Sequence, residues 1–159
     1  MDRQAAPYFT SYAQHDTKMV LHLLEQLAPQ LAASRTYEFK KWQDRDVLIG
    51  EGWHEAIVAE LERHRIALLM VTPTFLVRPY ILKEELPRIL VPGKIVLPVL
   101  LKPIDLGRQE AHGIEDLSIF AHRVSGHKRR PYSQCSPQQK ELFAIELYRA
   151  IENRLARDL

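Results

Sequence analysis

The sequence predicts an α/β domain built on a doubly wound parallel sheet of about five strands. Two observations lead to this prediction. Short apolar, β-prone runs alternate along the chain with segments whose apolar residues recur at helical spacing, and this alternation is typical of parallel strands joined by right-handed crossovers. The run at residues 66–71 is apolar at every position, as expected of a strand in the middle of a sheet that helices cover on both faces.

The first half of the chain reads as two strands and two helices. Residues 8–13 form a short β-prone run, and Asp16 is expected to cap the helix that follows. Residues 37–42 alternate aromatic and polar side chains like a half-exposed strand, and residues 43–52 form a charged loop that ends in glycine. The apolar faces of the two helices are formed by Met19, Val20, Leu23, Leu24, Leu27 and Leu31, and by Trp53, Ile57 and Leu61.

The second half contains the two most buried strands. After residues 66–71, a helical segment at residues 80–90 is interrupted by Pro79 and Pro87. Residues 95–101 predict another buried strand, in which Pro98 removes one ladder donor and indicates local irregularity.

The segment from residue 102 to residue 135 has no clear periodicity. It predicts one weak strand near residues 120–124, and its basic cluster at residues 127–130 reads as a solvated loop, with phosphate binding as the less favoured interpretation. A final helix begins at a capping box formed by Ser136 and Gln139. Its buried face is predicted to consist of Leu142, Ile145, Tyr148, Ile151 and Leu155.

Composition narrows the class of protein. The 159 residues suffice for one domain and not for a second full one, so residues 1–159 are treated as a single domain. The 22 basic and 20 acidic residues leave a charge of +2, too balanced to predict nucleic acid or a membrane as a partner. A single cysteine, no signal-peptide core and no apolar run long enough for a bilayer favour a cytoplasmic location.

Several motifs that carry chemistry are absent. No phosphate-binding P-loop and no G-x-S-x-G elbow occur, and Gly50-Glu51-Gly52 lacks the third glycine of a dinucleotide fingerprint. No metal site is expected, because His112, His122 and Cys135 follow no ligand spacing. The segment after the first strand also lacks the acidic cluster of a phosphoacceptor receiver domain.

Three segments, in this order, carry a family resemblance. Residues 8–13 (Y-F-T-S-Y-A) are similar to an F-I-S-Y box on a first strand. Residues 42–53 (W-Q-D-R-D-V-L-I-G-E-G-W) are similar to a tryptophan- and glycine-bounded BB loop. Residues 72–84 (T-P-T-F-L-V-R-P-Y-I-L-K-E) are similar to S-P-x-F-L-x-S-x-[YW]-C-x-x-E, with Thr72 in place of the first serine and Ile81 in place of cysteine. Together they resemble the Toll/interleukin-1 receptor (TIR) domain family, particularly its compact bacterial members.

The resemblance implies a flavodoxin-like fold and, for catalytically active members, cleavage of the bond between nicotinamide and ribose in NAD+. The essential glutamate of those members maps onto Glu84, and NAD+ is the substrate, so no separate cofactor is expected. The products implied are nicotinamide and either ADP-ribose or a cyclic ADP-ribose. The chemistry is reasonable, because nicotinamide leaves as a neutral molecule that needs no general acid, and one carboxylate can stabilise the positive ribosyl centre.

The family also implies partners and a biological role. Members self-associate through TIR–TIR contacts and are often joined to a fused or separate sensor domain, so the chain is expected either to be whole or to be excised from a longer protein. An effector of bacterial anti-phage defence, activated by oligomerisation, is the leading hypothesis. The alternative is a non-catalytic adaptor that acts by TIR–TIR interaction, including interference with host signalling.

The residues around Glu84 each have a functional and an ordinary interpretation. Tyr80 lies four residues before Glu84, so the two are expected to share one helix face and to border one pocket. The ordinary interpretation of Glu84 is a solvated helix residue, and Glu85 is then the competing candidate for the catalytic carboxylate. The ordinary interpretation of Tyr80 is a half-buried aromatic residue without a role in binding. Trp53 is expected either to stack on a base or to pack in the core.

The remaining candidates lie at the predicted carboxyl edge of the sheet. Ser11 and Tyr12 are expected to contact the substrate, and Arg45 to meet a phosphate. An interaction loop for assembly is expected to comprise Asp44, Asp46, Leu48 and Gly50. The alternative interpretation of Arg45 is that it forms a charged loop tip with Asp46, which serves assembly and does not contact the substrate.

Overall fold

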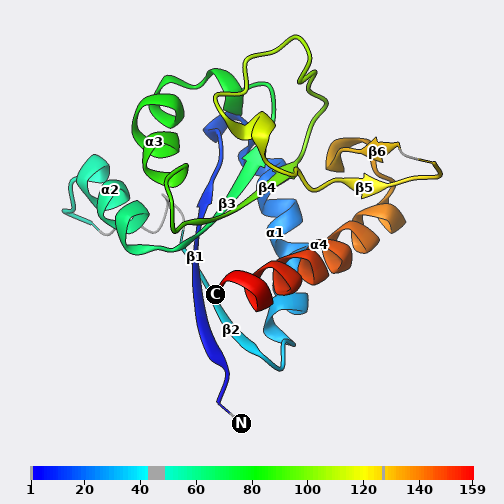
Figure 1. Ribbon diagram of the computed structural model, residues 1–159, viewed down its shortest axis with the longest axis horizontal. Helices are drawn as coiled ribbons and strands as arrows, with labels where there is room; N and C mark the ends of the chain where they lie inside the picture. Colours follow the sequence, from blue (N-terminus) through cyan, green and yellow to red (C-terminus); the bar gives the residue numbers. More distant parts are fainter. Residues whose placement is uncertain (1, 43–48, 127) are drawn as a thin grey trace.

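The structure is a computed structural model that describes residues 2–42, 49–126 and 128–159. At its centre lies a parallel sheet with the strand order β2-β1-β3-β4 (Figure 1). The strands are β1 (Gln4–Ser11), β2 (Tyr37–Trp42), β3 (Ile66–Val71) and β4 (Ile95–Leu100). The predicted doubly wound parallel sheet is confirmed, with four strands in the described part of the chain where about five were expected.

Helices and short turns connect the strands. The helices are α1 (Thr17–Ala32), α2 (Trp53–Arg63), α3 (Leu86–Ile89) and α4 (Pro137–Asp158). The short turns are η1 (Gln14–Asp16), η3 (Phe75–Val77), η4 (Ile81–Glu85), η5 (Ile114–Asp116) and η6 (Tyr132–Gln134). A small antiparallel hairpin pairs β5 (His122–Arg123) with β6 (Arg129–Arg130). None of the helices in the described residues is long and apolar enough to cross a bilayer.

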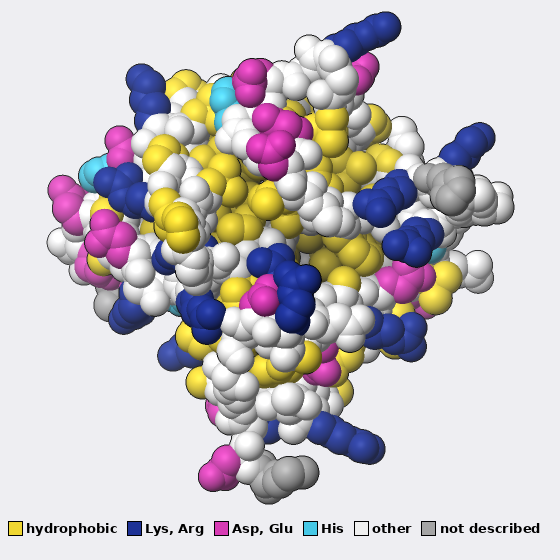
Figure 2. Space-filling model, in the orientation of Figure 1, with side chains coloured by type: hydrophobic (Ala, Val, Ile, Leu, Met, Phe, Trp, Pro, Cys, Tyr) yellow, Lys and Arg dark blue, Asp and Glu magenta, His cyan; other side chains and the backbone are white. Residues whose placement is uncertain are grey.

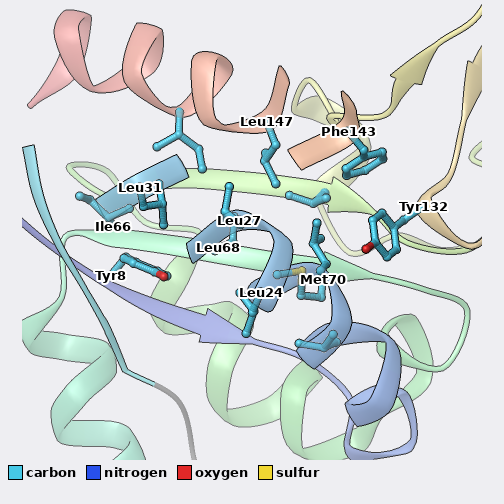
Figure 3. Packing of buried hydrophobic residues seen from close by; sticks show 14 of the residues in the cluster. Tyr8, Leu24, Leu27, Leu31, Ile66, Leu68, Met70, Tyr132, Phe143 and Leu147 are labelled. Atoms are coloured by element: carbon cyan, nitrogen blue, oxygen red, sulfur yellow. The ribbon is translucent and has the colours of Figure 1, made fainter. Parts of the chain in front are cut away.

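One face of the sheet is covered by α1 and α4. Their leucines and Phe143 pack on alternate residues of β1 and β3, as Figure 3 shows for Tyr8, Leu68 and Met70. The periodicity of α1 predicted its buried stripe. For α4 the predicted face is partly wrong: Ile151 and Leu155 are buried, but Leu142 is 51% exposed and Ile145 and Tyr148 are only half-buried. The helix instead buries Phe143, Ala144 and Leu147, one position away from the predicted stripe. The capping box that begins α4 is confirmed: the Ser136 side chain accepts from the Gln139 backbone, and the Gln139 side chain accepts from the Ser136 backbone.

The other face is covered by α2, η4 and α3. The intervening residues of the same strands, Phe9, Leu69 and Val71 among them, pack there against Ile57 and Ile81. Every residue of β3 is buried, because each successive side chain points to a different covered face. This explains the uninterrupted apolar run, and it confirms β3 as one of the two inner strands.

Pro98 leaves β4 regular, so the predicted irregularity is wrong. The amides of Ile95 and Leu101 donate to the β3 side, whereas Leu100 and Pro98 face the opposite side, where they exchange backbone hydrogen bonds with Phe120. The ladder position that lacks an N–H is therefore on the outer edge of the sheet, where proline is tolerated. The predicted strand at residues 120–124 is reduced there to one parallel bridge between Val99 and Phe120.

The outer edge of β4 borders an open hollow of about 440 Å³ beside α4. Its floor is apolar, and four arginines line it: Arg123, Arg129, Arg149 and Arg154. Figure 2 shows this face, with apolar side chains across its middle and basic side chains around them. Arg129 belongs to strand β6 and donates to the carbonyl of Ile119 at 2.7 Å, so the predicted loop is wrong for this residue, although its side chain is exposed as expected. His127 of the same cluster lies outside the described residues.

Asp16 does not cap α1, which corrects a second prediction. Its carboxylate is buried and accepts from the hydroxyl of Thr72 at 2.5 Å and from Nζ of Lys102 at 3.1 Å. The backbone of Asp16 has φ −96° and ψ 9°, far from the extended conformation that aims a capping side chain at the first helical amides. The residue instead connects the start of α1 to the segments that follow β3 and β4.

The predicted helix at residues 80–90 is a π turn followed by a short α-helix. The amide of Leu86 donates to Ile81, five residues earlier, before α3 resumes α-helical pairing. Pro87 supplies the physical reason. In a regular helix its ring would clash with the carbonyl of Lys83, and a wider turn relieves that clash.

Candidate functional site

The topological switch point of the sheet lies between β1 and β3. From β1 the chain passes to β2 on one side, and it returns to β3 on the other side. Ligands of open α/β sheets bind beyond the carboxyl ends of the strands at such a point. β1 ends there at Ser11, and the segment with η4 and α3 follows the end of β3.

Two aromatic rings and an imidazole lie together beside this point. Trp53 begins α2 and Tyr80 immediately precedes η4, and their ring centroids are 4.7 Å apart at an interplanar angle of 45°. His54 Nδ1 lies 3.2 Å from the hydroxyl of Tyr80. Trp53 is 47% exposed, so the alternative that it packs in the core is wrong. The pair leaves an aromatic surface open to solvent.

Glu84 extends the cluster with a carboxylate. Its side chain is 34% exposed, and its Oε2 lies 3.0 Å from Nη1 of Arg88 and 3.9 Å from Nε2 of His54. Arg88 also donates to the backbone carbonyl of Glu84 at 2.7 Å. Since Arg88 contacts both the side chain and the backbone of one residue, the carboxylate is held in place beside the imidazole. His54 therefore links Tyr80 to Glu84, and Arg88 contacts the same carboxylate, so the cluster includes two side chains that the sequence did not predict.

Glu85 occupies a different environment from its neighbour. It is 7% exposed, and the hydroxyl of Ser11 donates to its Oε1 at 2.5 Å. A buried carboxylate is stable only where hydrogen bonds compensate for lost hydration, and the end of β1 supplies one. The two adjacent carboxylates therefore lie in different environments. Glu84 is partly exposed to solvent beside His54 and Arg88, and Glu85 is buried against the first strand.

The other predicted residues are placed as follows. Ser11 and Tyr12 are buried at the carboxyl end of β1, with Ser11 directed at Glu85. Gly50 has φ +86°, in the left-handed region that glycine adopts without strain. Four predicted loop residues lie outside the described residues: Asp44, Arg45, Asp46 and Leu48.

Sequence reasoning missed His54 and Arg88. Arg88 follows Glu84 by four residues, and this spacing alone indicates an ion pair on a helix. His54 carried no signal of its own, because its partners come from a segment 26 residues further along the chain. In the described part of the chain, no group of three or more His, Cys, Asp or Glu side chains is arranged to hold a metal ion.

The fold and this cluster define a doubly wound α/β domain with a candidate ligand site at its switch point. The profile of the TIR domain family matches residues 9–129, which is most of the chain and includes the three motifs of the sequence except for Tyr8. The protein therefore belongs to the TIR domain family. A search of curated proteins found no match to this chain.

Proposed function

We propose that this TIR domain cleaves the nicotinamide–ribose bond of NAD+ and releases nicotinamide together with ADP-ribose or a cyclic ADP-ribose. The observation that carries the proposal is Glu84, a partly exposed carboxylate at the family's motif position. His54 connects it to the ring pair of Trp53, which is exposed, and Tyr80, which is half-buried. Family membership alone does not decide between an enzyme and an adaptor, because one fold hosts many functions.

The proposed chemistry needs one well-placed negative charge. As the bond to nicotinamide lengthens, positive charge develops on the ribose, and the pyridinium nitrogen becomes neutral. The carboxylate of Glu84 stabilises that positive centre, an effect that grows where water is excluded. Arg88 holds the carboxylate in one orientation in the free protein, and bound substrate competes with Arg88 for the same oxygen.

The aromatic pair suits the flat parts of the substrate. Trp53 and Tyr80 present ring surface on which nicotinamide or adenine can stack. His54 lies between Tyr80 and Glu84, close enough to hydrogen-bond a ribose hydroxyl. In this arrangement the base binds the rings and the ribose faces the carboxylate.

The test is nicotinamide release from NAD+ by concentrated protein, followed by chromatography. Glu84→Gln is expected to abolish release, because the amide keeps the shape and removes the charge. Glu141→Gln, on the exposed side of α4, is the matched control and should retain full activity. The nucleotide peak separates hydrolysis from cyclisation.

Glu85→Gln tests the competing carboxylate. Activity that survives in Glu84→Gln and disappears in Glu85→Gln would move the catalytic role to the buried residue beside Ser11. Since Glu85 also has a structural position, its variant must first be shown to unfold at a similar denaturant concentration to the wild type.

We propose further that activity depends on self-association, as in an effector of bacterial anti-phage defence coupled to a fused or separate sensor. Turnover per chain should then rise with protein concentration. If it stays constant from dilute to concentrated protein, the coupling is wrong.

The second candidate function is a non-catalytic adaptor that acts through TIR–TIR contacts, including interference with host signalling. Exposed apolar side chains favour it: Ile49 is fully exposed, Val77 is 69% exposed, and Trp53 is half exposed. Such side chains at one end of a domain are typical of protein contacts. No nicotinamide release at any concentration, together with measurable self-association, would favour the adaptor.

A further inference from the structure

A second hollow lies on the other side of the sheet from the candidate site. It holds about 330 Å³, within the range of small-molecule pockets, which begins at about 300 Å³. Its walls come from η1, α1, η6, α4 and Lys102, which follows β4. We call it the basic hollow, and it is lined by His15, Asp16, Lys18, Met19, His22, Lys102, Tyr132 and Lys140.

The charge of the basic hollow is positive. Three lysines line it against one carboxylate, that of Asp16. Asp16 is buried and already accepts hydrogen bonds from Thr72 and Lys102, so it contributes little free negative charge to the hollow. Lys18 and Lys140 remain to attract an anion, and Lys102 is held at the wall by its ion pair.

Tyr132 holds two of the lining groups in position. Its hydroxyl lies 2.6 Å from Nδ1 of His22, and Nζ of Lys140 lies 5.2 Å from the centre of its ring. Burial, with a smaller contribution from Cys135, raises the pKa of Tyr132 to about 12. The phenol and Nδ1 of His22 share one hydrogen bond, whose direction depends on the tautomer of the imidazole, and this bond fixes the ring of His22 at the wall of the hollow.

We propose that the basic hollow binds a phosphate group, either free or on a small organic ester. Lysines bind phosphate as point charges, and the oxygens of one phosphate accept from several donors at once. The hollow is larger than one phosphate needs, and Met19 with the ring of Tyr132 offers apolar wall to an organic substituent. The donors are already oriented by Asp16 and Tyr132, which lowers the cost of ordering them on binding. The site is independent of the proposed cleavage of NAD+, because it uses other residues on the opposite face of the sheet.

The test is titration with inorganic phosphate at constant ionic strength, observed through the imidazole NMR signals. His15 and His22 line the basic hollow, and His54 belongs to the candidate site on the other face, so it serves as an internal control. The signals of His15 and His22 should shift and saturate, and that of His54 should stay in place. Neither result depends on NAD+ cleavage.

Variants locate the binding. Lys140→Gln should weaken phosphate binding by roughly tenfold, as expected for the loss of one charged hydrogen bond. Lys18→Gln should also weaken it, and Lys40→Gln, on strand β2, should change it less than about twofold. A second titration with phenyl phosphate identifies the source: tighter binding than phosphate indicates an organic ester, and equal binding indicates the free ion.

Three results would overturn the proposal. One is a set of shifts that do not saturate and include His54, which indicates general screening. Another is an equal effect of Lys40→Gln and Lys140→Gln. The third is the absence of any shift of His15 and His22 at high phosphate concentration.

Discussion

The hydroxyl of Thr72 is the hydrogen-bonding centre of a buried network, and Thr72→Val removes it with little change in shape. The hydroxyl donates to Oδ2 of Asp16 at 2.5 Å and accepts from the amide of Phe75 at 3.0 Å. Thr72 is 0% exposed and Asp16 is 3% exposed, so water cannot replace the lost partner without structural change.

The magnitude follows from these two bonds. A buried hydrogen bond to a charged group contributes about 1.5–3 kcal/mol, and a buried amide left without its acceptor costs about 1 kcal/mol more. Thr72→Val should therefore lower the free energy of unfolding by about 3 kcal/mol, which corresponds to about 6–12 °C in Tm for a chain of this size. Equilibrium denaturation in urea measures the change directly.

Two further variants decide whether the network is responsible. Thr72→Ser restores the residue of the family motif and keeps both bonds, so it should cost less than about 1 kcal/mol, mainly for the lost methyl group. Thr74→Val, two residues along the chain and half-buried, should change stability by less than about 0.5 kcal/mol. A loss of less than about 0.5 kcal/mol in Thr72→Val itself would refute the reasoning, because removing a buried hydrogen bond to a carboxylate should cost more than this.

Three other measurements test separate parts of the fold. Ser136→Ala should destabilise the protein by about 1 kcal/mol through loss of the α4 cap, and Ser125→Ala should have no measurable effect in the same denaturation assay. Burial raises the pKa of Tyr8 and of Tyr132 to about 12, so between pH 10 and 12 the unfolded chain releases protons that the folded protein retains. Urea denaturation should therefore show stability falling as pH rises through that window, and Tyr→Phe at either position should reduce the slope. Gly50→Ala should cost about 1 kcal/mol in thermal unfolding because of its φ of +86°, and an unchanged Tm would show that the loop adapts.

The central elements were predictable because each carries a strong local sequence signal that agrees with the environment of the element in the fold. The all-apolar β3 has its side chains covered on both faces, and the capping box of α4 is formed by two side chains that are adjacent on the first helical turn. In both cases short-range sequence determines the structure, and the tertiary contacts agree with it.

Long-range contacts determine what the sequence could not predict. Asp16 looked like a helix cap, but Thr72 and Lys102 reach it from the ends of two strands that are distant in sequence. The segment from residue 102 to residue 135 is fixed by contacts with distant parts of the chain, such as the burial of Ile114 and Tyr132 in the two hydrophobic clusters and the backbone hydrogen bonds between Phe120 and β4. Such isolated anchors follow no helical or strand spacing, so the segment shows no periodicity in the sequence.

The candidate site depends on both local sequence and long-range contacts. A residue's place in a motif therefore does not by itself establish its role. Motif spacing counts residues, and it identified Glu84 four residues after Tyr80 on the assumption of a regular helix. The segment is a π turn instead, and in it Glu84 lies near both His54 and Arg88 while Glu85 is buried against Ser11. A buried carboxylate that accepts a hydrogen bond from a strand end is suited to fixing the turn. A partly exposed carboxylate is suited to the proposed role of stabilising positive charge that develops on the ribose. The environment of each carboxylate therefore supports Glu84 for catalysis independently of the motif, and the paired Gln variants measure whether that division of roles is correct.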